Sequence, residues 1–557
     1  MLVGELGAYR LAQSVPTIQV PATVQAVLAA RIDRLSPEDK RLLQTAAVIG
    51  MEVPVSLLQA IADVPAETLY RGLMHLQAAE FLYETRLLPD HAYTFKHALT
   101  HEVAYNSLLL ERRQVLHARI VAALEALTPE REAEQVERLA YHAVRGEVWD
   151  KALAYCRQAG VRANDRAAFR EAVAPYEQAL QALAHLPEDG DTRGLAIDLR
   201  FALGSVLAND LGELARGLAL VGEAEALARA LDDRAWLVRV LAKIGQLRGM
   251  RGDLDGALTA GQQALEHAVE LGDSALQVEA SYFLGQAYEA SGDFSRAAEL
   301  QRWNVEATDR QSDTPRTNLR SQPRARLATI LGALGAFAEG RRHGEEALRL
   351  ATLDGRGDRP LIAHGSLGEL YLAQGDLEHA IQVLEQGLAL SRASGNRNWV
   401  RQIAGTLGYA YALQGRLAEG RALLEEAISE AIRMGGGRLY ARHVAWLSEV
   451  CRLAGHGEEA WQHARQALDL AWQHKQRANE AHALYQLGVV QAHADPPDAA
   501  QAEAHYQQAL TLAEALGLRP LQAHCHHGLG TLYATTSRRS RPALSCPLPS
   551  RCTAPWA

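Results

Sequence analysis

The 557-residue sequence is poor in aromatic residues and in cysteine. Only 6% of its residues are aromatic although 48% are hydrophobic, so alanine and leucine supply most of the apolar surface. This composition suits closely packed helices and fits poorly with β-sandwiches, which draw on aromatic and β-branched strand residues. The five cysteines, Cys156, Cys451, Cys525, Cys546 and Cys552, are few and scattered. We therefore expect a reducing, cytoplasmic setting and no disulfide framework.

The sequence also lacks the features of membrane, nucleotide-hydrolysing and strongly basic proteins. No apolar run approaches the roughly 20 residues of a membrane span, and the first residues do not resemble a signal peptide. The net charge of −9 is mild for this length and gives no general attraction to nucleic acid or anionic membranes. No Gly-x-x-x-x-Gly-Lys-Ser/Thr motif is present to bind phosphates. We expect no enzyme activity, no catalytic residues and no cofactor.

What the sequence does contain is a repeated pattern of helical hairpins. A Leu-Gly pair followed by tyrosine and a second glycine recurs, most clearly between Leu367 and Ala427. The small residue after the leucine or isoleucine of each first helix marks the repeat, at Gly204, Gly245, Gly285, Ala328, Gly368, Gly408, Ser448, Gly488 and Gly530. The spacing of 40 to 43 residues exceeds the roughly 34 of a standard tetratricopeptide unit, whose core marks it nevertheless resembles.

One such hairpin cannot bury its own apolar side, so neighbouring hairpins must stack. We therefore predict an all-α protein whose main part, residues 128–535, is a right-handed tetratricopeptide-like helical-hairpin solenoid. The small marker residue lets the two helices of a hairpin approach closely. Glycines such as Gly292 and Gly375 should end first helices in the left-handed conformation, and the aspartate that follows each should cap the next helix.

Residues 23–127 are predicted to form a small helical, winged-helix-like domain with a short β-hairpin. The apolar spacing from Val24 to Ala79 is helical, and Ser36-Pro37-Glu38-Asp39 is a strong helix start. The runs 81–84 and 92–95 then indicate the two strands of a hairpin. Acidic residues slightly outnumber basic ones in this domain, so the charge expected of a DNA-binding surface is absent.

Three segments of this domain resemble a known protein family. Ile32–Ser36, Leu43–Gly50 and Phe95–Tyr105 look like the segment that follows the ATPase module of bacterial STAND-type signal-transduction ATPases. Those proteins are often fused to class III adenylate or guanylate cyclase domains and end in tetratricopeptide-like repeats. The resemblance extends to about Tyr533 and implies that this chain begins after both the cyclase and the ATPase cores.

The resemblance also gives His97 a candidate role. A histidine at this place in the related ATPases can contact bound ADP, so His97 would sense nucleotide only if an ATPase domain were supplied. Local packing at a helix start is the favoured interpretation for this chain. A zinc site with His101 is not expected, because Tyr105 occupies the second ligand position of a His-Glu-x-x-His motif. The side chains of His524-Cys525-His526-His527 point in several directions on a helix, so we predict no metal site.

Binding by such a solenoid is expected on its concave face, which the first helices line. Mixed charges and aromatic side chains there suit a protein or peptide partner, although an ordinary solvated helix face remains the alternative for each residue. The residues that we predict to face this groove are Glu279, Tyr282, Gln286, Glu289, Arg442, Glu449, Arg452, His482 and Tyr485.

Several segments depart from the repeat. Residues 1–22 are predicted to be a remnant hairpin and linker, residues 308–326 an extended polar loop, and residues 495–498 a lengthened turn. Residues 536–557 lack periodicity and are predicted to be a disordered tail. Since a solenoid normally ends in a polar capping helix, we expect truncated or frame-shifted ends and an exposed apolar face near Leu521.

The sequence thus favours a non-catalytic, effector-sensing interaction region of a signal-transduction ATPase or cyclase regulator. Its expected partners are a protein or peptide on the concave face and an ATPase or cyclase domain encoded upstream. One alternative is a free-standing tetratricopeptide scaffold or adaptor. Another is a DNA-binding regulator acting through the winged helix, which the charge disfavours.

Overall fold

The computed structural model divides the chain into two units. Unit 1 comprises Met1–Ala159 and Gln181–Leu186, and unit 2 comprises Gly160–Leu180 and Pro187–Ala557. The structure describes residues 2–3, 10–11, 22–86, 91–127, 135–310, 320–355, 358–434 and 439–535.

Unit 1 combines short helices with a small antiparallel sheet. The sheet has the order β3-β5-β4, and a separate two-residue pairing joins β1 to β2 near the N-terminus. The strands are β1 (Leu2–Val3), β2 (Arg10–Leu11), β3 (Glu52–Pro54), β4 (Leu82–Arg86) and β5 (Ala92–Phe95). The helices are α1 (Ala22–Asp33), α2 (Pro37–Ile49), α3 (Val55–Ala62), α4 (Ala66–Ala78), α5 (Ala98–Asn106), α6 (Leu110–Leu127) and α7 (Val136–Arg145). They are followed by α8 (Trp149–Asp165) and α9 (Phe169–Leu183), which contribute to both units.

The local signals in this unit give the structure that they predict. The Ser36 hydroxyl accepts a hydrogen bond from the Asp39 backbone N–H at 3.0 Å, Pro37 is the first residue of α2, and Gly50 ends the helix. Strands β4 and β5 pair in the predicted hairpin, with Leu82 opposite Phe95. The third strand, β3, was not predicted, because it has only three residues and ends at a proline that also opens α3. The winged-helix assignment stays a prediction.

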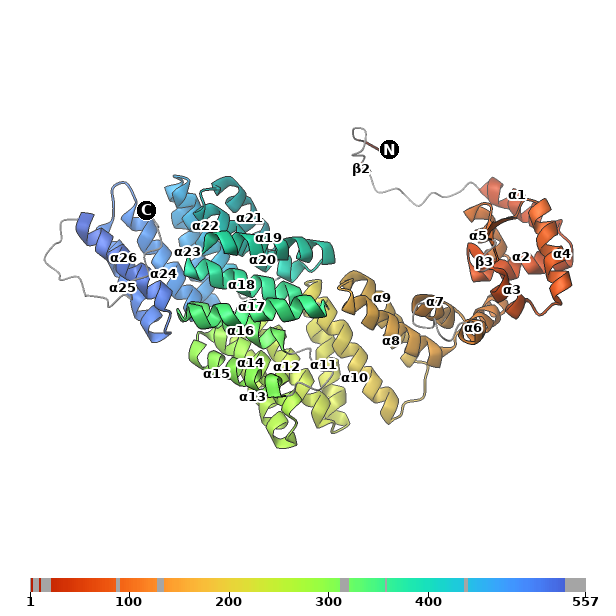
Figure 1. Ribbon diagram of the computed structural model, residues 1–557, viewed down its shortest axis with the longest axis horizontal. Coiled ribbons are helices and arrows are strands. Elements are labelled where there is room, and N and C mark those ends of the chain that lie inside the picture. Colours follow the sequence, from red (N-terminus) through yellow and green to blue (C-terminus); the bar gives the residue numbers. More distant parts are fainter. Residues whose placement is uncertain are drawn as a thin grey trace. The chain divides into compact units, whose positions relative to one another are not determined.

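Unit 2 is the predicted tetratricopeptide-like helical-hairpin solenoid, in which hairpin stacks on hairpin from α10 to α26 (Figure 1). The first helices are α10 (Gly190–Ser205), α12 (Arg234–Arg251), α14 (Ser274–Ser291), α16 (Ser321–Ala333), α18 (Arg359–Gln374), α20 (Arg397–Leu413), α22 (Tyr440–Leu453), α24 (Arg477–Ala492) and α26 (Arg519–Thr535). The second helices are α11 (Leu214–Ala230), α13 (Leu254–Leu271), α15 (Phe294–Arg310), α17 (Phe337–Asp354), α19 (Leu377–Ser394), α21 (Leu417–Arg433), α23 (Gly457–Gln473) and α25 (Ala499–Ala515). Helix α10 continues into a π-helical turn, η2 (Val206–Asp210).

The repeat marks have the packing roles expected of them. Gly292 and Gly375 end α14 and α18 with φ of 94° and 82°, and Asp376 caps the next helix through the His379 backbone N–H. The small marker residue sits where two helices almost touch. A Cβ added to Gly408 would lie 2.7 Å from the Gly420 carbonyl oxygen, so any larger residue would force α20 and α21 apart.

Two predictions about irregular segments are corrected by the structure. The predicted loop at 308–326 is helical at both ends, because α15 continues to Arg310 and α16 begins at Ser321; residues 311–319 lie outside the described part. An ion pair between Arg324 and Asp309 joins those helices, so the arginines that suggested a loop contribute to packing. The prediction of an exposed apolar face near Leu521 is also wrong. This side chain is only 3% exposed, because α26 packs against α24 and α25.

The remaining predictions for the ends and turns have mixed outcomes. The lengthened turn at 495–498 is confirmed between α24 and α25. Of residues 1–22, only the β1 and β2 pairing and the start of α1 are described, and the predicted tail, 536–557, lies outside the described residues. Within the described part, no helix is long and apolar enough to cross a membrane.

Candidate functional site

A polar cavity of about 250 Å³ lies inside unit 2. Four successive first helices and the η2 turn meet there, because the repeat places equivalent residues of α10, α12, α14 and α16 on the same side of the solenoid. The N-terminus of α18 and residues of α8 and α9 complete the wall. Its polar lining includes Asn164, Asp165, Asn209, Lys243, Gln246, Gln322, Asp358 and Arg359, and its aromatic lining includes Phe169, Tyr176, Tyr282 and Phe283.

Lys243 and Asp358 form the charged centre of this cavity. Lys243 is 7% exposed, donates a hydrogen bond from Nζ to Gln246 Oε1 at 2.9 Å and lies 5.0 Å from the centre of the Phe283 ring. Burial raises the pKa of Asp358, and the nearby positive charges of Lys243 and Arg326 oppose this shift. The positive charge of Lys243 therefore partly offsets the cost of burying a negative charge on Asp358.

Beside this centre, Arg326 connects the cavity wall to a second set of buried groups. Its guanidinium carbon lies 5.8 Å from the centre of the Trp399 ring, and Tyr282 is among the groups that raise its pKa. Tyr282 is 3% exposed, and burial raises the pKa of its hydroxyl. Glu289 is similarly buried, and its negative charge acts on both Arg326 and Tyr282. These buried groups lie beside the cavity wall and influence one another electrostatically.

Asn209 is a polar residue of the cavity lining with an unsatisfied side-chain oxygen. Its Oδ1 atom is buried and has no hydrogen-bond partner in the structure. The residue lies in η2, and single π-helical turns occur frequently at functional sites. A buried carbonyl oxygen without a donor costs free energy, so a ligand N–H or O–H placed here would remove that cost.

A second interior cluster is built on α20, α22, α24 and α25. Glu449 and Arg452 form an ion pair at 2.8 Å, and both side chains are mostly buried. The ring of Tyr485 lies 5.8 Å from that of Tyr506, and burial raises the pKa of both hydroxyls. Because these side chains pair with one another and are buried, we assign the cluster a packing role.

The predicted groove residues fall into two groups. Glu279, Tyr282, Gln286 and Glu289 lie on α14, and Arg442, Glu449, Arg452, His482 and Tyr485 lie on α22 and α24. Of these, only Tyr282 lines the cavity. Others have partners within the protein. The Glu279 carboxylate contacts Arg239 at 3.3 Å, and Arg442 Nε donates to Asn479 Oδ1 at 3.2 Å. Burial and the neighbouring Arg442 lower the pKa of His482 to about 3.

The inner face of the solenoid is therefore more covered than we expected. Tyr282 and Glu289 were predicted to line an open groove, yet they are 3% and 5% exposed. The reason is that the first helices pack on first helices five hairpins later, as α14 does on α24 and η2 does on α20. The cavity is the space left within this packing.

Sequence reasoning missed Lys243, Arg326, Asn209 and Asp358. Lys243 and Arg326 each lie two residues before a repeat marker, a position that was not assigned to the inner face. A lysine within the apolar run Val240–Ile244 was the available signal. Nothing in the sequence indicated that α10 would end in a π-helical turn.

His97 and His101, the candidate nucleotide-sensing and zinc-binding residues, have different surroundings. His97 is exposed at the start of α5, and its side chain makes no capping hydrogen bond. His101 Nε2 lies 2.9 Å from the Ala47 carbonyl oxygen, and its ring packs against Phe95, so its role is structural. No group of three or more metal-binding side chains occurs in the part of the chain that the structure describes.

The three described cysteines are not reactive thiols. Cys156, Cys451 and Cys525 are buried, and none of them forms a disulfide within the part of the chain that the structure describes. Burial raises their pKa values to about 12, 11 and 12 respectively. Thiolates are the reactive form of cysteine, so burial favours the less reactive thiol form of these three side chains near neutral pH.

Comparisons with known proteins agree with the repeat fold. Residues 272–427 match the family described as the MalT-like TPR region. A sequence relative is the uncharacterized protein R02095 of Rhizobium meliloti (strain 1021), which is 29% identical over 204 residues. This match covers 36% of the chain and 20% of R02095, so the chain spans about a fifth of that relative.

Three solved structures resemble the chain at low sequence identity. A STAND protein with a tetratricopeptide repeat sensor from Pyrococcus horikoshii has a TM-score of 0.45 and 14% identity, covering 83% of this chain and 67% of that one. A Rap protein complexed with competence and sporulation factor has a TM-score of 0.47 and 13% identity, and the match covers 66% of this chain and 99% of the Rap chain. NprR with its cognate peptide NprX has a TM-score of 0.43 and 15% identity, with 60% and 94% covered.

Proposed function

We propose that this chain is the non-catalytic sensor region of a signal-transduction ATPase and that the cavity of unit 2 binds its effector. The repeat fold, the match to the MalT-like TPR region and the sequence resemblance of residues 23–127 to STAND-type ATPases support this proposal. The winged-helix-like domain would pass effector occupancy to an ATPase or cyclase domain supplied by another part of the protein or by a partner.

The observation that carries the proposal is the cavity itself. A polar space enclosed by four successive first helices, with charges of both signs and an amide oxygen that has no donor, is costly unless it is used. Its amides and charge pairs can hydrogen-bond to both the donors and the acceptors of a ligand. This chemistry suits a short peptide segment, whose backbone offers both.

The test uses a random tetrapeptide pool and two alanine-to-leucine variants. Ala202 lines the cavity, so Ala202→Leu should partly fill it, whereas Ala230→Leu places the same side chain at an exposed position at the end of α11. The pool should raise the melting temperature of the native protein and of Ala230→Leu, but not that of Ala202→Leu. At a hundredfold excess over the dissociation constant, binding adds about 2.7 kcal/mol. Equal shifts in both variants, or no shift in the native protein, would overturn the proposal.

The absence of a nucleotide site is tested separately. The chain alone should bind neither ATP nor ADP in calorimetric titrations, because it has no phosphate-binding loop. Heat of binding that His97→Ala abolishes would show that this chain senses nucleotide without an ATPase domain. The free-standing scaffold is distinguished by gene context, since a phosphate-loop ATPase encoded immediately upstream favours the sensor.

A further inference from the structure

The solenoid of unit 2 touches itself along a regular line of contacts. Three turns at the ends of first helices meet turns that lie five hairpins later, 222 to 224 residues along the chain. A fourth, at Gly335, meets the turn after α25, four hairpins later. The four pairs, which we call the seam, are Gly212 with Met434, Gly252 with His474, Gly292 with Leu516, and Gly335 with Arg519. One superhelical turn thus comprises about five hairpins, and the seam joins successive turns.

Each seam glycine has two reasons to lack a side chain. All four have φ between 76° and 94°, the left-handed conformation that ends a first helix. Each also approaches its partner closely. A Cβ on Gly212 would lie 3.1 Å from Met434 Cγ, and a Cβ on Gly252 would collide with His474 Nδ1. A left-handed turn does not by itself require a close partner. Gly415 has φ of 93°, yet a Cβ added there would have nothing within 4 Å.

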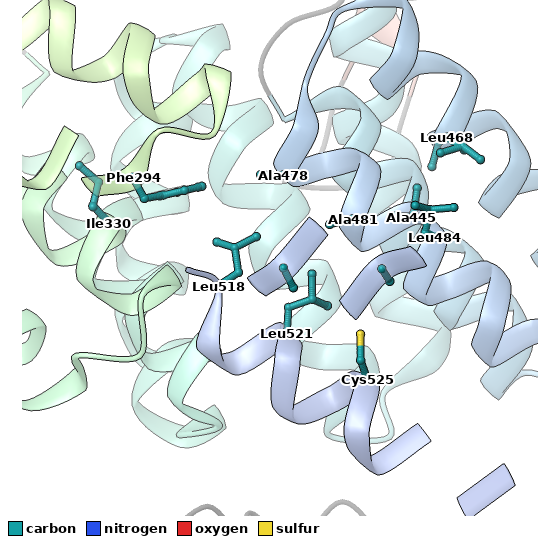
Figure 2. Close-up of a cluster of buried hydrophobic side chains, with 14 of the residues drawn as sticks. Phe294, Ile330, Ala445, Leu468, Ala478, Ala481, Leu484, Leu518, Leu521 and Cys525 are labelled. Carbon is teal, nitrogen blue, oxygen red and sulfur yellow. The ribbon is translucent and has the colours of Figure 1, made fainter. Parts of the chain in front are cut away.

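The two ends of the seam differ in strength. Near Gly292 and Gly335 a continuous apolar cluster crosses it, in which Leu518 and Leu521 pack in one core with Phe294 and Ile330 (Figure 2). At the Gly252 pair the seam instead has an ion pair, Lys475 Nζ to Asp255 Oδ2 at 2.6 Å, whose side chains are 71% and 76% exposed. Exposed ion pairs contribute little stability, so this end is the one that can open.

The helices of the weak end also line the cavity. The η2 turn contributes Asn209 and ends at the Gly212 contact, while α12 contributes Lys243 and ends at the Gly252 contact. Opening the seam there would shift both helices and move Asn209 and Lys243 relative to Asp358 on α18. A ligand that bonds to all three groups would therefore favour the closed form, since a ligand shifts an equilibrium only by binding one state better.

We infer that the Gly212 and Gly252 contacts are a latch that opens and closes the superhelical turn, and that effector in the cavity closes it. The second half of this inference rests on the proposed function, whereas the latch itself does not. Closure changes the pitch of the solenoid, which is a movement that an attached switch domain can detect.

The latch is tested with a pair of glycine variants in the full chain. Gly252→Val should open the seam because the new side chain collides with His474, while Gly415→Val imposes the same backbone strain where no partner exists. Small-angle scattering should give a larger radius of gyration for Gly252→Val than for Gly415→Val, with equal helical circular dichroism. If the two variants scatter alike, there is no latch.

A crosslink reports closure directly and connects it to the cavity. The crosslinking variant carries Asp255→Cys and Lys475→Cys, with Cys546→Ser and Cys552→Ser to remove the cysteines of the C-terminal segment. A short bismaleimide should join the two introduced cysteines within one chain. The yield of this crosslink should fall several-fold when Gly252→Val is added. The tetrapeptide pool should raise the yield, and Ala202→Leu should abolish that rise. If the pool shifts the melting temperature but leaves the crosslink yield unchanged, the claim that effector closes the latch is wrong, while the latch itself stands. Failure to crosslink overturns the latch whether or not the pool binds.

Discussion

Two buried histidines in unit 1 form a hydrogen bond that requires at least one of them to remain neutral. The Nδ1 atoms of His117 on α6 and His142 on α7 are 2.8 Å apart, so one must donate and the other accept. His117 Nε2 also lies 3.0 Å from the Tyr105 hydroxyl. Burial, with nearby arginines, lowers the pKa of His117 to about 4; burial and His117 lower that of His142 to about 3. Protonation of the accepting Nδ1 atom would break the bond, and protonation of either ring would bury a positive charge.

This pair should make unit 1 sensitive to acid. Because the folded pKa values lie below the unfolded value of about 6.5, the unfolded chain binds more protons as the pH falls. The stability that this pair contributes is fully present above about pH 6.5 and is lost progressively as the pH falls toward 4 and then 3, by an amount on the order of 3 kcal/mol for each histidine. Urea unfolding of unit 1 at several pH values should show this loss. His142→Phe should reduce it, and His97→Phe, at an exposed position, should not. An unchanged pH dependence in His142→Phe would contradict the assignment.

Residues whose role is local were predictable from the sequence, and residues whose role depends on distant contacts were not. Ser36 and Gly375 act on their own helix ends, so their neighbours in the sequence reveal them. Lys243 and Asp358 acquire their roles only when α12 and α18 close around one cavity. For the same reason Tyr282 was correctly placed on the inner face but wrongly expected to be exposed.

Helix α2 provides a test of how much one cap contributes. Ser36→Ala removes the hydroxyl that accepts the Asp39 N–H, which should cost about 1 kcal/mol. Hydrogen exchange of the first-turn amides of α2 should accelerate accordingly. Ser56→Ala, at an exposed position on α3, is the matched control and should change stability by less than about 0.5 kcal/mol. Equal effects would mean that the cap does not stabilise α2.

The helical hairpins themselves were predicted well because each carries its own signals. Apolar spacing and the small marker recur along the array, and a capping glycine ends most first helices, so an error in one hairpin did not affect the prediction of the next. The errors occurred where composition conflicted with packing. Arg324 and Arg326 suggested a polar loop, but the structure places both on α16, in an ion pair with Asp309 and against Trp399.

The closure of the superhelix could not be predicted from the repeat. A period of about 40 residues fixes how one hairpin stacks on the next, while the small rotation per hairpin that determines the pitch leaves no sequence pattern. The apolar cluster that joins α15 and α16 to α24 and α26 is therefore visible only in the structure. A solenoid with such a cluster is no longer stabilised by neighbouring hairpins alone.

Two leucines on the last hairpins distinguish these forms of stabilisation. Leu518 belongs to the cluster that crosses the seam, whereas Leu532 belongs to a local cluster with Val489, Tyr506 and Leu529. Both side chains are buried, so substitution by alanine should cost about 2–5 kcal/mol in either case. The two variants should differ in which helices show faster hydrogen exchange. Leu518→Ala should accelerate exchange in α15 and α16 as well as in α26, and Leu532→Ala should affect α24 to α26 only. If α15 and α16 are unchanged in Leu518→Ala, each hairpin depends on its sequence neighbours alone, and the crossing cluster adds nothing to stability.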